Sequence, residues 1–122
     1  MQADERAIRD LHERWLRAEC EGRPDAVLAL CTPDVVMQPP VGEAVRGRSA
    51  VADLLAASAG AVEDIAVTDM IIEVAEGLAV KRARFATRVV GRAETITGTH
   101  LWLLRPRWRV AFVTWSFDTL PG

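Results

Sequence analysis

The sequence has no tyrosine and no asparagine, and Lys81 is its only lysine. Without tyrosine, no reaction that relies on a phenol as its acid is available to this chain. An excess of charge of one sign is also missing, since 15 basic residues stand against 17 acidic ones and the formal net charge is −2. Both signs are interspersed, so we expect neither a nucleic-acid partner nor attachment to an anionic membrane.

Long hydrophobic runs are absent as well. The unbroken apolar segments span only a few residues, far fewer than the roughly 20 that cross a bilayer. No charged segment followed by an apolar one opens the chain, as it would in a secretory signal. These observations predict a protein that stays in the cytoplasm.

Cysteine is scarce, with Cys20 and Cys31 as the only two. They lie on separate predicted helices, without the clustered Cys/His spacing of a metal site. A disulfide between them is possible, but a chain with this much apolar sequence does not require one. Cys31 lies in the run VLALC and is expected to be a small buried hydrophobe. Since the sequence shows neither a metal-binding cluster nor a phosphate-binding loop, we expect neither a metal nor a cofactor; a Ser-His-Asp order is missing as well.

Composition and length indicate one folded domain. Of the 122 residues, 50% are hydrophobic and 26% are charged, which is the balance of a globular rather than a disordered chain. This length suffices for one hydrophobic core and is too short for two. We therefore expect a single domain over residues 1–122.

Apolar residues at helical spacing predict three helices in the first half of the chain. The second, over residues 24–30, starts with a proline, which suits a first helical position. Ser49 is expected to cap the third helix, which Gly60 ends. The first covers residues 3–20, and its buried stripe consists of Ile8, Leu11, Trp15 and Ala18.

From Ile65 onward the hydrophobic period changes from 3.6 residues to 2. This predicts four long strands over residues 64–76, 78–90, 94–104 and 107–117, preceded by a short buried strand at 35–38. Helices followed by hairpin-linked strands favour an α+β fold, with three N-terminal helices packed on a curved, mostly antiparallel sheet.

Three segments carry a resemblance to a known family. They are EGRPDAVLALCTPDVVMQPPVG at residues 21–42, GRSAVADLL at 47–55 and RWRVAFVTWS at 107–116. Their order and spacing resemble the nuclear-transport-factor-2-like superfamily, and within it the SnoaL-like and ketosteroid-isomerase-like small proteins. The resemblance covers nearly the whole chain and implies a cone-shaped, cystatin-like roll. It does not imply one reaction, because this superfamily includes isomerases, cyclases, hydrolases, dehydratases and proteins that only bind a ligand.

The residues that would carry steroid-isomerase chemistry are all replaced. By the resemblance, the tyrosine of the oxyanion hole falls on Trp15 and the base falls on Pro39, beside Gln38. The acid of the oxyanion hole falls on or near Thr99, next to His100. The two histidines of the terminal pattern fall on Phe112 and Thr114. Steroid isomerisation by that mechanism is therefore excluded.

His100 and His12 remain as candidate catalytic residues, since imidazole transfers protons near neutral pH. Strand alternation makes the position of His100 uncertain. If Thr97, Thr99, Leu101 and Leu103 face the pocket, His100 and Trp102 face the outside of the sheet or a dimer interface. His12 follows Leu11 on the first helix and is expected at the edge of the buried stripe.

Six further residues are candidates for ligand contact. Gln38 either bonds to backbone at the proline turn or orients a ligand, because a buried amide needs partners. Thr99 and Thr114 are ordinary strand residues that are also able to hydrogen-bond a ligand. The apolar members fit either a core or a hydrophobic cavity. They are Trp15, Phe85 and Phe112. Trp102 and Trp115 are assigned to the opposite face and to a dimer interface.

Two hypotheses follow for the function. In the first, a homodimeric protein binds a hydrophobic small molecule in an apolar pocket and isomerises or cyclises it, with a polyketide-like or other ring-forming substrate implied by the resemblance. In the second, the protein is a non-catalytic binding or dimeric assembly module, associating through the outer face of the sheet.

Overall fold

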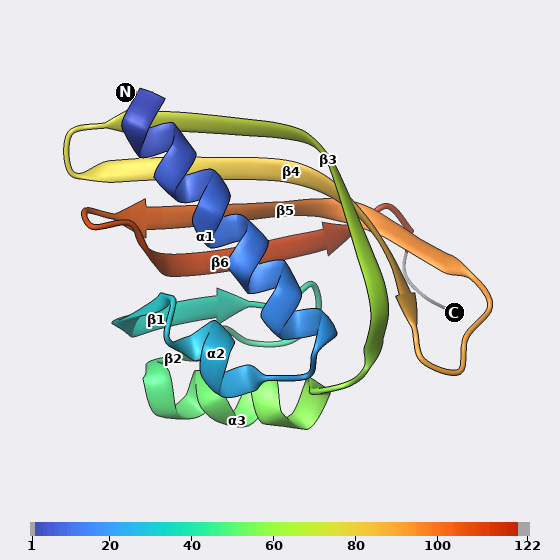
Figure 1. Cartoon of the computed structure of the whole chain (residues 1–122). Helices are drawn as coiled ribbons and strands as arrows, with labels where there is room; N and C mark the ends of the chain where they lie inside the picture. The colour runs from blue at the N-terminus through green and yellow to red at the C-terminus, as the bar shows by residue number, and fades with distance from the viewer. Residues whose placement is uncertain (1, 120–122) are drawn as a thin grey trace.

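The computed structural model describes residues 2–119. Three helices precede the long strands, and a short two-strand segment separates the second helix from the third (Figure 1). The helices are α1 (Gln2–Cys20), α2 (Pro24–Leu28) and α3 (Arg48–Ser58). The strands are β1 (Cys31–Gln38), β2 (Val45–Arg46), β3 (Val62–Ala75), β4 (Leu78–Val89), β5 (Thr95–Arg105) and β6 (Arg109–Phe117).

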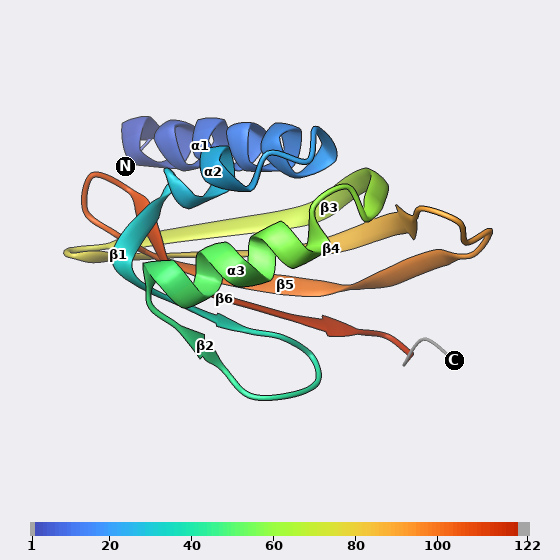
Figure 2. The ribbon, with the colours of Figure 1, turned by 90° about the horizontal axis from the view of Figure 1, so that it is seen from below.

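All six strands form one sheet in the order β2-β1-β6-β5-β4-β3. Strands β1 and β6 run parallel to each other, and every other neighbouring pair is antiparallel. The three helices lie on one side of the curved sheet, as the view turned by 90° shows (Figure 2). The predicted α+β fold of three helices on a mostly antiparallel sheet is confirmed.

The core lies between α1 and the concave face of the sheet. The predicted stripe of α1 is buried, and His12 is buried beside it. From the sheet, Trp102, Leu104 and Val110 complete this core, each at most 2% exposed. Burial of one large apolar side chain contributes about 1.5–3 kcal/mol to the free energy of unfolding, so this contact holds the longest helix on the sheet.

Arg48, the first residue of α3, fastens that helix to its neighbours. Its guanidinium donates from one nitrogen to the carbonyl of Leu28 at 3.1 Å and to the carbonyl of Cys31 at 2.8 Å. These carbonyls lie at the end of α2 and the start of β1. The Arg48 side chain therefore fixes the start of α3 against α2 and β1.

Two local predictions are wrong, and one short strand was missed. The first strand starts at Cys31 and not at Val35, and its pairing with β6 is irregular between Cys31 and Val36. Ser49 does not cap α3, which begins after Gly47, a residue with a φ of 86°. Strand β2 was not expected, since it has only two residues.

Both cysteines are free; Cys20 is exposed and Cys31 is buried. Within residues 2–119, no helix combines the length and the hydrophobicity that crossing a membrane requires.

Candidate functional site

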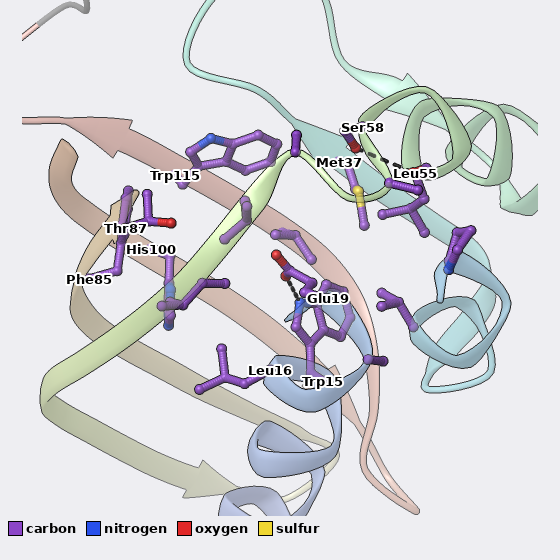
Figure 3. Close-up of a pocket in the computed structure, with 18 of the residues that line it drawn as sticks. Trp15, Leu16, Glu19, Met37, Leu55, Ser58, Phe85, Thr87, His100 and Trp115 are labelled. Atoms are coloured by element: carbon purple, nitrogen blue, oxygen red, sulfur yellow. Dashed lines mark hydrogen bonds between the residues drawn. The ribbon is translucent and has the colours of Figure 1, made fainter. Parts of the chain in front are cut away.

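A pocket of about 350 Å³ lies between the C-terminal half of α1, the helix α3 and the concave face of the sheet (Figure 3). Its wall is mainly apolar, as is usual for sites that bind small molecules. Helix α1 provides Trp15 and α3 provides Leu55. The sheet contributes Ile65, Phe85, Val113 and Trp115, among others.

Few polar side chains reach this wall, and most of them are engaged elsewhere. Ser58 donates to the carbonyl of Leu54 at 3.1 Å, within its own helix. Thr87 donates to the carbonyl of Asp64 at 2.8 Å. Arg23 is exposed and pairs with Glu21 at 3.8 Å. The remaining ionisable groups on the wall are Glu19 and His100.

Glu19 enters the pocket because it lies one helical turn after Trp15 on α1. The Trp15 indole Nε1–H donates to its carboxyl oxygen Oε1, as the dashed line in Figure 3 marks. Burial raises the pKa of the Glu19 carboxyl, while the hydrogen bond from Trp15 and the charge of Lys81 oppose this shift. The second oxygen, Oε2, has no protein partner among the described hydrogen bonds.

His100 projects from β5 on the same side of the sheet as Trp102. Its ring stacks near the rings of Phe85 and Trp102, with centroid distances of 6.1 Å and 5.9 Å. Burial lowers the pKa of His100 to about 3, and the charges of Lys81 and His12 add to the shift, so the imidazole is uncharged near neutral pH. Its buried Nε2 has no hydrogen-bond partner within residues 2–119, which is uncommon for a buried polar atom.

Lys81, which was not among the predicted site residues, lies beneath α1 and is fully buried. Its Nζ is 2.5 Å from Nδ1 of His12 and 3.2 Å from the ring centroid of Trp102. Burial lowers the pKa of Lys81 to about 6, against the opposing charge of Glu19. Burial also lowers the pKa of His12 to about 4, and the charges of Lys81 and Arg9 contribute. Both groups are therefore mainly uncharged above pH 7.

A signal in the sequence pointed to Lys81. Strand alternation places it on the same side of β4 as Ala83 and Phe85, opposite Arg82 and Arg84. Because three arginines follow nearby, the lysine resembled another solvated charge. Glu19 was missed for a related reason, since a carboxylate beside a buried stripe is expected to turn towards water.

The facing of β5, which the sequence left open, and that of β6 both differ from the arrangement that would place Thr99, Phe112 and Thr114 in the pocket. His100, Trp102 and Trp115 point to the pocket side, and Trp102 packs on Trp15 with ring centroids 4.6 Å apart. Thr99, Phe112 and Thr114 lie on the opposite face, outside the pocket lining. The expectation that Trp102 and Trp115 form a dimer interface is therefore wrong. Both faces carry apolar side chains, so alternation alone did not show which one the helices cover.

Of the sequence candidates, Trp15, Phe85 and His100 meet around the pocket. His12 lies behind them, with its ring centroid 6.0 Å from that of His100. Gln38 lies outside the lining, where its amide donates to the carbonyls of Pro39 at 3.0 Å and Gly42 at 3.1 Å. Thr114 donates to the carbonyl of Gln38 at 3.1 Å, and Thr99 accepts from Arg84 at 3.0 Å.

Solved structures share this fold at low sequence identity. A nuclear-transport-factor-2-like protein of unknown function from Pseudomonas putida superposes with a TM-score of 0.86 at 19% identity, covering 99% of both chains. A putative scytalone dehydratase from Novosphingobium aromaticivorans superposes with a TM-score of 0.83 at 15% identity, and the alignment covers 97% of this chain and 86% of that one. A ketosteroid isomerase-like protein from Erwinia carotovora atroseptica superposes with a TM-score of 0.76 at 21% identity, and the alignment covers 93% of this chain and 95% of that one.

No protein of curated function matches the sequence. The model of the SnoaL-like domain matches residues 12–113, from the middle of α1 to β6. This match includes all or part of every helix and strand that lines the pocket. The chain therefore belongs to the family of SnoaL-like domains.

Proposed function

We propose that the protein binds a hydrophobic small molecule in the pocket beneath α1 and α3 and isomerises or cyclises it by proton transfer. The observation that carries this proposal is the pair of desolvated ionisable groups, Glu19 and His100, on an otherwise apolar wall. Ionisable groups with shifted pKa values in a pocket are typical of sites that move protons.

The two groups suit different parts of such a reaction. Glu19, whose pKa burial raises, holds a proton closer to neutral pH than an exposed carboxyl does and is able to donate it to a carbonyl oxygen. Trp15 occupies Oε1, so Oε2 is the oxygen directed to a ligand. The uncharged imidazole of His100 offers one donor and one acceptor nitrogen, and either one is able to bind a hydroxyl or enol of the ligand.

The ligand class follows from the wall. A volume of about 350 Å³ lined mainly by aromatic and aliphatic side chains accommodates a compound of one to three rings with a carbonyl or hydroxyl group. A polyketide-like or other ring-forming carbonyl compound fits this description. Exclusion of water from the pocket would also suppress competing hydrolysis.

A non-catalytic role is the second candidate. It is supported by the outer face of the sheet, where Leu101, Leu103 and Phe112 are only partly buried in the single chain. Such a face suits a homodimer, in which the protein would act as a binding or assembly module.

Exchange of α-hydrogens in heavy water separates the two candidates. The probe is 2-tetralone, a hydrophobic bicyclic ketone, and its exchange is followed by NMR. We expect catalysed exchange that falls by about 10²-fold or more in Glu19→Gln, the usual effect of removing a general acid or base. The exposed Glu21→Gln is the matched control. Binding of 2-tetralone without any catalysed exchange would establish the non-catalytic role.

A further inference from the structure

Lys81 is the one lysine of the chain and is completely buried. Among the described ion pairs, none involves Lys81. Its amine instead contacts a neutral imidazole nitrogen and the face of an indole, at 2.5 Å and 3.2 Å. A buried lysine without a carboxylate partner is destabilising as an ammonium ion, so these surroundings favour the uncharged amine.

The groups that face this amine come from three elements. Helix α1 contributes His12 at contact distance and the Glu19 carboxyl further away, and β5 contributes His100 and Trp102. The neighbouring β3 residue in the ladder is Ile72, which does not titrate. The proton-transfer function proposed above makes no use of Lys81.

The amine of Lys81 lies close to the pocket, separated from it along β4 by one residue of the same face. On the concave side of β4, Lys81 is followed by Ala83 and then Phe85, and alternate residues of a strand are about 6.6 Å apart. Ala83 pairs with His100 and carries only a methyl group, whereas Phe85 and His100 both line the pocket. The flexible four-carbon side chain of lysine is long enough for Nζ to span the spacing between alternate residues and reach the pocket wall.

We propose that Lys81 is a covalent site for hydrophobic aldehydes and ketones, which enter the pocket and form an imine with its amine. The inference rests on the proposed function, because it requires the same pocket to admit the ligand. It narrows the substrate class to compounds with a free carbonyl group.

The step is balanced without an oxidant or a reductant. The lone pair of Nζ attacks the carbonyl carbon, and the C=O electron pair moves to oxygen. One N–H proton passes through His12 to the oxygen, and the other stays on nitrogen. A second proton, from a carboxylic acid, lets the oxygen depart as water while the C=N bond forms, so the product is the protonated imine. Glu19, which lines the pocket that admits the ligand, would supply this second proton and be left as a carboxylate. The protonated imine would then acidify the neighbouring C–H bonds, which is the activation that an isomerase or cyclase needs.

Reductive trapping tests the proposal, with cinnamaldehyde as the probe and cyanoborohydride as the reductant near pH 7. Peptide mapping locates the adduct, because the only other amine is at the N-terminus. The reference is the amine introduced by Arg82→Lys in a Lys81→Met background, which lies exposed on the opposite face of the same strand. Nα-acetyl-lysine in solution is a second reference that needs no folding.

We expect Lys81 to be trapped at least about tenfold faster than either reference, since near pH 7 an ordinary lysine is free amine to only about one part in 10³. The advantage should disappear in guanidinium chloride. Trapping no faster than the references would overturn the imine.

Cinnamyl alcohol, which has the same shape but no carbonyl, tests the pocket separately through tryptophan fluorescence. Its failure to bind would overturn the proposed ligand site. Binding of the alcohol together with slow trapping would overturn the imine alone.

Discussion

The Trp108 indole donates its Nε1–H to the Asp4 carboxylate at 3.0 Å, across 104 residues of sequence. This bond connects the turn between β5 and β6 to the first turn of α1. Trp108 takes a φ of 43° there, and Arg107 before it a φ of 68°, so the tight turn aims the indole at the helix. The N-terminal end of α1 is thus held on the sheet by a polar contact in addition to its apolar stripe.

Trp108→Phe should lower the free energy of unfolding by about 1–2 kcal/mol, because the ring remains but the donor to a charged acceptor is lost. Urea denaturation measures the change. Asp4→Asn is the matched variant, since an amide oxygen still accepts the bond and a smaller loss is expected. Equal losses in both variants would show that the charge, and not the bond, matters.

Lys81→Met should change how stability depends on pH. Between the folded pKa of about 6 and the ordinary value of 10.5, the unfolded chain binds a proton that the folded chain does not. The free energy of unfolding therefore rises with pH in this window, by at most about 1.4 kcal/mol per pH unit. Denaturation curves at about pH 7 and about pH 8.5 should show this slope in the parent and not in the variant.

At about pH 7 we also expect Lys81→Met to be the more stable protein, with the gap narrowing as pH rises. Below pH 6.5, His12 and His100 act in the same direction, because burial depresses the pKa of both. Both proteins should therefore lose stability as the pH falls from there. Parallel slopes above pH 7 would contradict the buried free amine.

Gly98→Ala should destabilise the sheet beside the pocket. A Cβ at this position would lie 1.9 Å from the carbonyl oxygen of Ser116 and 2.7 Å from the ring of Phe85. Overpacking of this kind costs about 1–3 kcal/mol. Thermal unfolding measures it, with the exposed Thr95→Ala on the same strand as control. Because Phe85 lines the pocket, binding of cinnamyl alcohol should weaken as well, and unchanged binding would mean that the ring does not shift.

Leu103→Asp tests association through the outer face of the sheet. Leu103 pairs with Phe112 on that face, so a charge there should shift a dimer towards monomer in sedimentation equilibrium. Binding of cinnamyl alcohol should persist, since Leu103 does not line the pocket. Ala56→Asp, exposed on α3, is the control. A protein that is monomeric before the substitution would remove the assembly role.

The elements themselves were predictable because their patterns are long. The stripe from Ile8 to Ala18 and the alternation after Ile65 each repeat often enough to give the type of structure without tertiary information. Residues 32–34 show the limit, since a proline and an aspartate favour a turn locally, although the strand runs through them between its β6 pairs at Cys31 and Val36. Pairing between segments distant in sequence decides such cases.

The site was predictable only in part. Trp15, Phe85 and His100 were named, but the pocket-facing sides of β5 and β6 were not identified, because both sides of these strands carry large apolar residues. Glu19 and Lys81 were overlooked because burial of a charge is unfavourable, so both side chains were expected to reach water, although alternation placed Lys81 on the same side of β4 as Phe85. Hydrophobic patterns therefore predict the location of buried ionisable side chains less well than that of apolar ones.

Because the single lysine lies beneath α1, its chemical modification reports how often this helix detaches from the sheet. Reagents that acylate amines and are too bulky for the pocket have no other ε-amino group to attack. They reach Lys81 only when the helix lifts from the sheet, so the rate of acylation measures how often α1 detaches. The same arrangement leaves the folded surface without a lysine side chain for immobilisation, crosslinking or enzymatic tagging.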